Sequence, residues 1–169
     1  WNKALSTITI QTKNEKDKRI FYTALFHTMI DPAIFNDANG DYRGTDKKVY
    51  RHAPFVNYSV FSFWDTYRAE NPLFILTQPK RVADMIQSML AIYDQQRLLP
   101  IWPLVGTETG TMVGIASRQV IAEAYLKGIG GFDPRRAFNA LTGTSIKDTL
   151  GMGYAKKFEA IPVDKQSRP

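Results

Sequence analysis

The sequence predicts a mainly α-helical fold, and three observations support this. Several segments of about 15 residues repeat apolar residues at helical spacing. No run of alternating polar and apolar residues is long enough to build a central β-sheet. The 169 residues are 44% hydrophobic and 22% charged, which is the composition of an ordinary globular domain.

The first predicted helix runs from about Glu15 to Ile30. It stops before Asp31-Pro32, because a residue that precedes proline disfavours the helical conformation. Its apolar side chains lie on more than one side, so we expect neighbouring elements to pack on both faces. A long loop rich in Gly, Asp and Lys follows over residues 36–54 and is predicted to contain a small β-hairpin.

The clearest helical pattern lies between Gln78 and Gln96. Its apolar residues fall on one face of a 3.6-residue period, and they are Val82, Met85, Ile86, Met89, Leu90 and Tyr93. Pro79 fits the first turn of this helix, where the backbone amide has no intrahelical partner in any case.

Two further helices are predicted in the second half of the chain. One spans Met112 to Lys127 and ends at Gly128, a residue suited to the left-handed conformation that closes a helix. The other begins at Asp133-Pro134, where an N-cap residue precedes a proline at the first helical position.

The net charge of +6 first suggests a nucleic-acid partner, but its distribution argues against one. Residues 1–19 hold five Lys/Arg against two Asp/Glu, residues 154–169 hold four against two, and the long middle is nearly balanced. We therefore expect no nucleic-acid partner. No apolar run approaches the roughly 18 residues of a membrane-spanning helix, and zero cysteines exclude disulfides and thiol chemistry.

Metal-binding patterns are weak in this chain. The segment Asp37–Asp41 resembles the start of an EF-hand loop, but Tyr42 stands where that loop needs glycine and Lys48 where it needs glutamate. Turn formation explains the segment better. His27 and His52 show no paired spacing, so no metal ligand is predicted within these residues.

Aromatic residues beside isolated carboxylates are the remaining candidates for chemistry. Trp64, Asp65 and Arg68 lie together, and Trp102 precedes Glu108 by six positions. An indole face can stack on a sugar ring while carboxylates bond its hydroxyls. A plain structural alternative for Glu108 is an acidic residue that stabilises the start of the following helix.

Several ordered motifs resemble the family 92 glycoside hydrolases, which are calcium-dependent exo-acting α-mannosidases. These motifs lie mostly within residues 15–133 and include Phe21 to Met29, Phe35-Asn36-Asp37, Gly40 to Gly44, Phe61 to Glu70, Gln78-Pro79, Met85 to Leu90, Leu99 to Trp102, Glu108-Thr109, Met112-Val113-Gly114 and Val120 to Ile129.

This resemblance implies that residues 1–169 are part of an (α/α)6 toroid of helical hairpins with long loops, within a larger multidomain enzyme. It implies hydrolysis of terminal α-mannose, often α-1,2-linked, from mannosides or N-glycans with inversion. Glu108 matches the general acid of the family. Trp64, Asp65, Arg68 and Trp102 match positions that bind the sugar, with Asp65 on its hydroxyls and Arg68 either on the sugar or paired with Asp65.

The resemblance also implies what this chain lacks. An inverting enzyme needs a second carboxylate, roughly 6.5–9.5 Å from the acid, to activate water. The family's base motif has no counterpart here, so we expect the chain alone to be inactive, with the base and most calcium ligands in the remainder of the enzyme. A secreted, periplasmic or cell-surface location is expected by the same resemblance. The alternative is a non-catalytic helical carbohydrate-binding or interaction module of shared ancestry.

Overall fold

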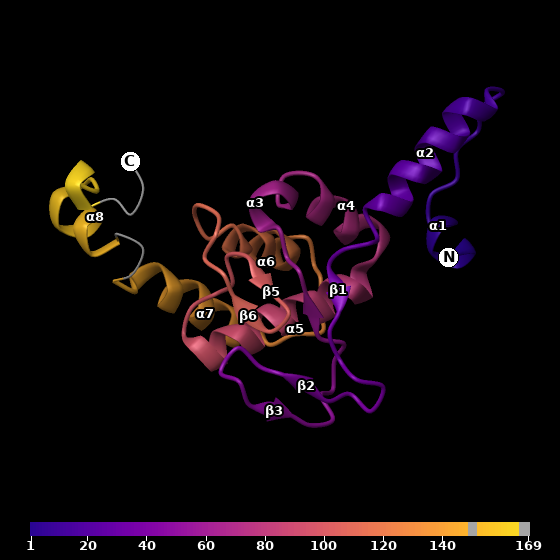
Figure 1. Ribbon diagram of the computed structural model, residues 1–169. Helices are drawn as coiled ribbons and strands as arrows, with labels where there is room; N and C mark the ends of the chain where they lie inside the picture. Colours follow the sequence, from indigo (N-terminus) through magenta and orange to yellow (C-terminus); the bar gives the residue numbers. More distant parts are fainter. Residues whose placement is uncertain (149–151, 166–169) are drawn as a thin grey trace.

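The computed structural model describes residues 1–148 and 152–165. About half of the residues are helical, and the strands are two residues long each. The prediction of a mainly α-helical chain is therefore confirmed (Figure 1). No helix in the described part of the chain is both long enough and apolar enough to span a bilayer.

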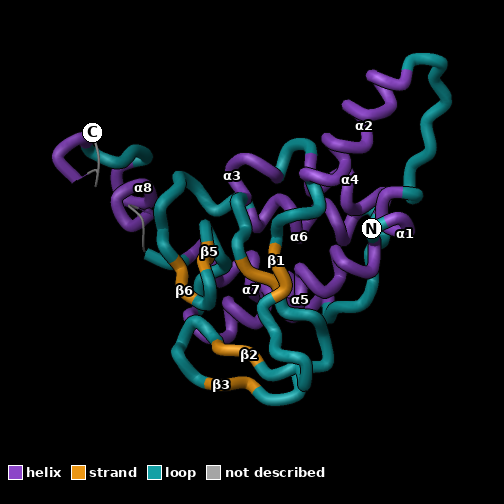
Figure 2. The backbone as a smooth tube through the Cα atoms, turned by 45° about the vertical axis from the view of Figure 1, so that its right-hand side comes forward, coloured by secondary structure: helices purple, strands orange, loops and turns teal. Residues whose placement is uncertain are grey.

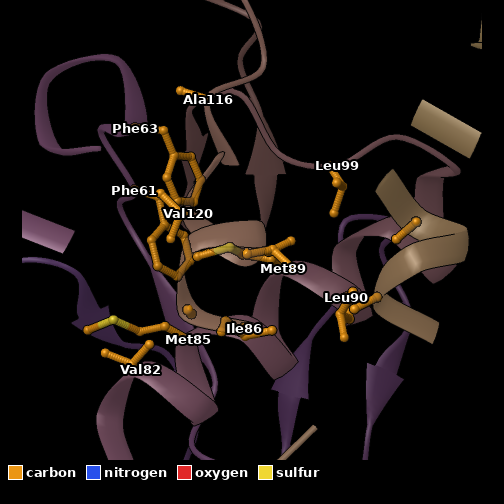
Figure 3. Packing of buried hydrophobic residues seen from close by; sticks show 14 of the residues in the cluster. Phe61, Phe63, Val82, Met85, Ile86, Met89, Leu90, Leu99, Ala116 and Val120 are labelled. Atoms are coloured by element: carbon orange, nitrogen blue, oxygen red, sulfur yellow. The ribbon is translucent and has the colours of Figure 1, made fainter. Parts of the chain in front are cut away.

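Helix α5 (Pro79–Gln96) lies at the centre of the fold. It contacts α4 (Glu70–Thr77), α6 (Ser117–Leu126), α7 (Pro134–Ile146) and strand β4 (Tyr58–Ser59). The apolar face predicted from the sequence is the buried one, and Figure 3 shows the cluster that it forms. Its most deeply buried members include Phe61, Phe63, Val82, Met85, Ile86, Met89, Leu90, Leu99, Val120 and Ile121.

The ends of α5 follow from its sequence. Pro79 occupies the first turn, as predicted, and the helix closes at Arg97, whose φ of 58° is left-handed. The Arg97 amide donates to the Tyr93 carbonyl over 2.7 Å and satisfies one of the last free carbonyls of the helix.

Helix α7 begins as predicted. The Asp133 carboxylate accepts a hydrogen bond from the Arg135 amide over 2.9 Å, and Pro134 takes the first helical position. The apolar side chains of this helix are only partly buried, since Ala137 is enclosed while the Phe138 side chain is 64% exposed.

Helix α6 begins five residues later than the predicted Met112. Gly110 and Gly114 adopt φ values of +61° and +71°, which a right-handed helix cannot contain, so residues 109–116 form a loop instead. The predicted end of the helix is confirmed, because Gly128 with φ +80° follows the C-cap residue Lys127.

Helix α2 (Glu15–His27) lies apart from the body of the fold, next to α1 (Asn2–Leu5), as Figure 1 shows. The prediction that neighbours cover both of its faces is wrong for the described residues. Only Leu25 is buried in this helix, and Ile20 is 57% exposed. The Asn14 side chain caps its first turn through the Lys16 amide.

The long loops contain three short antiparallel β-ladders. β1 (Ala33–Ile34) pairs with β4, β2 (Tyr42–Arg43) pairs with β3 (Val49–Tyr50), and β5 (Pro103–Leu104) pairs with β6 (Thr107–Glu108). The β2–β3 pair is the hairpin predicted within residues 36–54. Figure 2 shows the ladders as short segments within long loops.

The remaining described elements are short. They are α3 (Phe63–Thr66), α8 (Met152–Phe158) and a 3-10 turn, Val163–Lys165. Helix α3 bears two of the predicted sugar-binding residues, Trp64 and Asp65.

Candidate active site

The loop that leads to Glu108 is anchored to two helices. The Leu99 amide donates to Thr144 Oγ1 on α7 over 3.0 Å, and both groups are buried. The next residue, Pro100, accepts at its carbonyl from Ser117 Oγ on α6 over 2.6 Å. These two bonds fix where the β5–β6 hairpin leaves the helical core.

The β5–β6 hairpin turns at Val105 and Gly106, whose φ values of 46° and 71° are both positive. Two positive φ values in a two-residue hairpin loop match the twist of the flanking strands. Gly106 also packs closely, since a Cβ there would lie 2.9 Å from the Arg43 carbonyl oxygen. The turn of the hairpin therefore lies directly against strand β2.

The half-buried Glu108 side chain turns back toward its own hairpin. Its Oε2 accepts from the Ile101 amide over 2.8 Å. Its Oε1 accepts from the amides of Trp102 over 3.0 Å and Gly110 over 2.8 Å. Glu108 ends strand β6 and lies nine positions before α6, so the alternative that it stabilises the start of that helix is wrong.

These three amides hold the Glu108 carboxyl group in one position. Oε2 accepts one hydrogen bond and Oε1 accepts two, so both oxygens are bound to backbone N–H groups.

Trp102 joins the Glu108 hairpin to α3. Its indole Nε1 donates to Ser62 Oγ over 2.9 Å, and Ser62 Oγ donates to Asp65 Oδ2 over 2.6 Å. The structure thus brings together three of the predicted residues, Trp102, Glu108 and Asp65. Ser62 was missed, because a single serine beside aromatic residues has no spacing signal.

Trp64 and Arg68 flank Asp65 in sequence, and both contact Tyr67. The Trp64 side chain is 41% exposed, and its ring centroid lies 6.4 Å from that of Tyr67. Arg68 Nε donates to the Tyr67 hydroxyl over 2.8 Å. Within residues 1–148 and 152–165, no ion pair joins Arg68 to Asp65, so Ser62 is the partner that orients this carboxylate.

A cavity of about 230 Å³ opens beside Ser62, between the end of α2 and the start of α4. Glu70 lies in the wall of this cavity, where burial and the nearby Asp31 carboxylate raise its pKa to about 7. Neither Glu70 nor Asp31 was identified from the sequence as a site residue. The cavity is lined by His27, Asp31, Pro32, Val60, Phe61, Ser62, Thr66, Glu70, Asn71 and Phe74.

The Asp37–Asp41 segment forms a turn, as its composition suggested. The Gly40 amide donates to the Asp37 carbonyl, and Asp41 Oδ1 accepts from the His52 amide over 2.8 Å. Across the described residues, no three His, Asp or Glu side chains converge as metal ligands. The acidic and histidine side chains of the described residues therefore do not form a complete calcium site by themselves.

The chain is similar to solved α-mannosidases. The family GH92 α-mannosidase BT3965 from Bacteroides thetaiotaomicron shares 38% identity over 99% of this chain and 23% of its own, with a TM-score of 0.93. The structure of its complex with mannoimidazole shares 39% identity over 98% of this chain and 22% of its own, with a TM-score of 0.93.

A second relative is more distant. The family GH92 inverting mannosidase BT2199 from Bacteroides thetaiotaomicron shares 27% identity over 96% of this chain and 23% of its own, with a TM-score of 0.85. The chain thus spans less than a quarter of the length of these structures. A search of curated protein sequences found no significant match.

The family model described as the glycosyl hydrolase family 92 catalytic domain matches residues 1–167, which is nearly the whole chain. This match agrees with the 38% identity to BT3965 across 99% of the chain. The chain therefore belongs to glycosyl hydrolase family 92, within its catalytic domain.

Proposed function

We propose that these 169 residues are part of an exo-α-mannosidase that releases terminal α-mannose, with α-1,2-linked mannosides or N-glycans as substrates. Family membership supports the reaction class. The observation that carries the proposal is the Glu108 carboxyl, fixed by three backbone amides and connected through Trp102 and Ser62 to Asp65.

In this proposal Glu108 is the general acid that protonates the departing glycosidic oxygen. Asp65 accepts hydrogen bonds from mannose hydroxyls through Oδ1, which has no protein partner among the described residues. Trp64 and Trp102 form apolar walls for the sugar ring, and Arg68 binds the sugar or orders the wall through Tyr67. Acid catalysis of this kind typically contributes about 10²- to 10⁴-fold to the rate.

Inversion requires a second carboxylate to activate water on the opposite face of the sugar. We place this base, and most ligands of the family's calcium ion, in the remainder of an (α/α)6 catalytic domain outside residues 1–169. BT2199 is described as an inverting mannosidase, which favours the same stereochemistry here. The chain alone is then inactive, and a secreted, periplasmic or surface location suits a glycan substrate.

The test compares Glu108→Gln with the wild type in the full-length enzyme, using two substrates. On an unactivated α-1,2-mannobiose, kcat falls by about 10²- to 10⁴-fold, because the leaving oxygen lacks its proton donor. On an aryl α-mannoside with an acidic phenol, the loss is much smaller, because that leaving group departs without protonation. Equal losses on both substrates would remove Glu108 from the acid role.

The alternative, a non-catalytic carbohydrate-binding module, gives a different outcome in the same experiment. The wild-type protein would then bind mannoimidazole or mannobiose in calorimetry but release no mannose from either substrate. Release of mannose that depends on Glu108 excludes this module.

A further inference from the structure

Ser62 lies in a rigid stretch of backbone. Its neighbours Phe61 and Phe63 are 2% and 1% exposed, and their rings stack with centroids 4.9 Å apart. Its carbonyl accepts from the amides of Asp65 and Thr66 in the first turn of α3, over 3.1 and 3.0 Å. The main chain at Ser62 is therefore fixed by the core on both sides.

The Ser62 hydroxyl does not cap helix α3, although Ser62 is its N-cap residue. A serine at an N-cap ordinarily accepts hydrogen bonds from amides of the first turn, yet Ser62 makes no such side-chain bond. Its hydroxyl instead lies between two side chains of the candidate site, Trp102 and Asp65.

The direction of both hydrogen bonds follows from the groups themselves. An indole N–H can only donate, so Ser62 Oγ accepts from Trp102 Nε1. The single hydroxyl proton of Ser62 is then available to donate, and Oδ2 of the Asp65 carboxylate accepts it. Ser62 therefore uses one donor and one acceptor position to join the two side chains.

Asp65 needs this support because its side chain is exposed, and an exposed carboxylate samples several rotamers. The bond to Oδ2 restricts the rotamer and leaves Oδ1 without a protein partner among the described residues. Trp102 is fixed at both ends, by Ser62 at the indole and by Glu108 at the amide.

We propose that Ser62 is a positioning residue, which holds Asp65 toward the sugar and couples it through Trp102 to the Glu108 hairpin. This inference rests on the proposed function, because it assigns Ser62 a role in the same site. It concerns the orientation of Asp65 and Trp102, so its main effect falls on sugar binding.

The experiment uses the full-length enzyme and the variants Ser62→Ala, Ser62→Thr and Asp65→Ala. Ser62→Ala should weaken mannoimidazole binding and lower kcat/KM on α-1,2-mannobiose by about 10- to 100-fold, mostly through KM. Ser62→Thr keeps the hydroxyl and should restore most of the loss. Ser145→Ala is the control, since this half-buried serine bonds Arg118 outside the site.

A double-mutant cycle separates positioning from general stability. If Ser62 acts through Asp65, then Ser62→Ala adds little to the loss already caused by Asp65→Ala. Additive losses, or unchanged mannoimidazole affinity in Ser62→Ala, would overturn the inference. Should Ser62→Ala not fold, Ser62→Cys replaces it, since a thiol keeps the size but bonds weakly.

The two proposals fail in different ways. If the wild-type enzyme releases no mannose, the proposed function fails and this inference falls with it. If the wild type is active and Glu108→Gln behaves as an acid variant, while Ser62→Ala matches the wild type, only the role of Ser62 is refuted.

Discussion

The backbone amide of Trp102 lies 3.0 Å from Oε1 of Glu108, so the proposed proton donor is also a structural part of its own hairpin. Glutamine at this position would present an amide nitrogen to at least one of the three backbone N–H groups that face the carboxylate. The stability and the activity of Glu108 variants therefore need separate measurements.

We expect Glu108→Gln to lower the free energy of unfolding by about 1–3 kcal/mol, the cost of leaving one amide donor facing another donor. Equilibrium denaturation in urea measures the change. Glu123→Gln is the matched control, because Glu123 pairs with Lys127 on the surface of α6, where such pairs contribute about 0.3–0.5 kcal/mol. Equal stability of the two variants would contradict the three-amide arrangement.

Gly106→Ala should destabilise the protein through two effects. A positive φ costs an alanine about 1–2 kcal/mol, and the new Cβ would also meet the Arg43 carbonyl oxygen at 2.9 Å. Gly114→Ala isolates the first effect, because Gly114 has the same φ of +71° and no atom lies within 4 Å of the position that a Cβ would take there. The thermal unfolding midpoint of Gly106→Ala should be clearly lower than that of Gly114→Ala. Equal midpoints would argue against the close contact.

Thr144→Val should lower stability by about 1–3 kcal/mol with almost no change in shape, because it leaves the buried Leu99 amide without an acceptor. Since Leu99 begins the loop to Glu108, activity should fall more steeply with temperature as well. Thr142→Val on the same helix is exposed and should stay within about 0.5 kcal/mol of the wild type. Urea denaturation of both variants, side by side, checks the difference.

Glu70 gives a prediction about pH. Burial and Asp31 raise its pKa in the folded protein from 4.5 to about 7, so the folded state binds this proton more tightly than the unfolded state. Its contribution to stability is present in full below pH 4.5 and is lost as the pH rises through 7. The change is on the order of 1–2 kcal/mol, reduced from the full shift because the side chain is partly solvated.

Glu70→Gln should therefore flatten the fall in stability between pH 4.5 and 7. Denaturation midpoints measured across this interval give the comparison. Glu15→Gln, at an exposed position in the first turn of α2, controls for the loss of one negative charge. A pH profile of Glu70→Gln that parallels the wild type would show that another group controls the dependence.

The helices were predictable wherever local chemistry marks their ends. Pro79 and Asp133-Pro134 fix the starts of α5 and α7, and the stripe of α5 predicts its buried face. The start of α6 was misplaced because Val113 continues the apolar spacing, although it is 66% exposed and precedes a glycine with positive φ. Spacing cannot reveal a backbone angle at Gly114.

Burial of α2 was mispredicted for a related reason. Apolar residues on several sides of a helix, such as Ile20 and Phe26, predict that other elements pack against it. They do not indicate which part of the protein those elements come from. The described residues cover only Leu25 fully in this helix.

The candidate site was predictable as residue types but not as a network. Resemblance to the family indicated Trp102, Glu108 and Asp65, whereas the bonds that join them pass through Ser62, which has no pattern of its own. The amides that fix Glu108 are equally invisible in the sequence, because every non-proline residue has one. Only the folded hairpin brings Ile101, Trp102 and Gly110 to the same carboxylate.

Val105 has a consequence for protein engineering. A β-branched residue at φ 46° is strained, and its side chain is 55% exposed, so little packing offsets that strain. Asparagine tolerates this conformation and is preferred before glycine in such turns. Val105→Asn, three residues before Glu108, should therefore raise the free energy of unfolding by about 1 kcal/mol without altering any buried side chain.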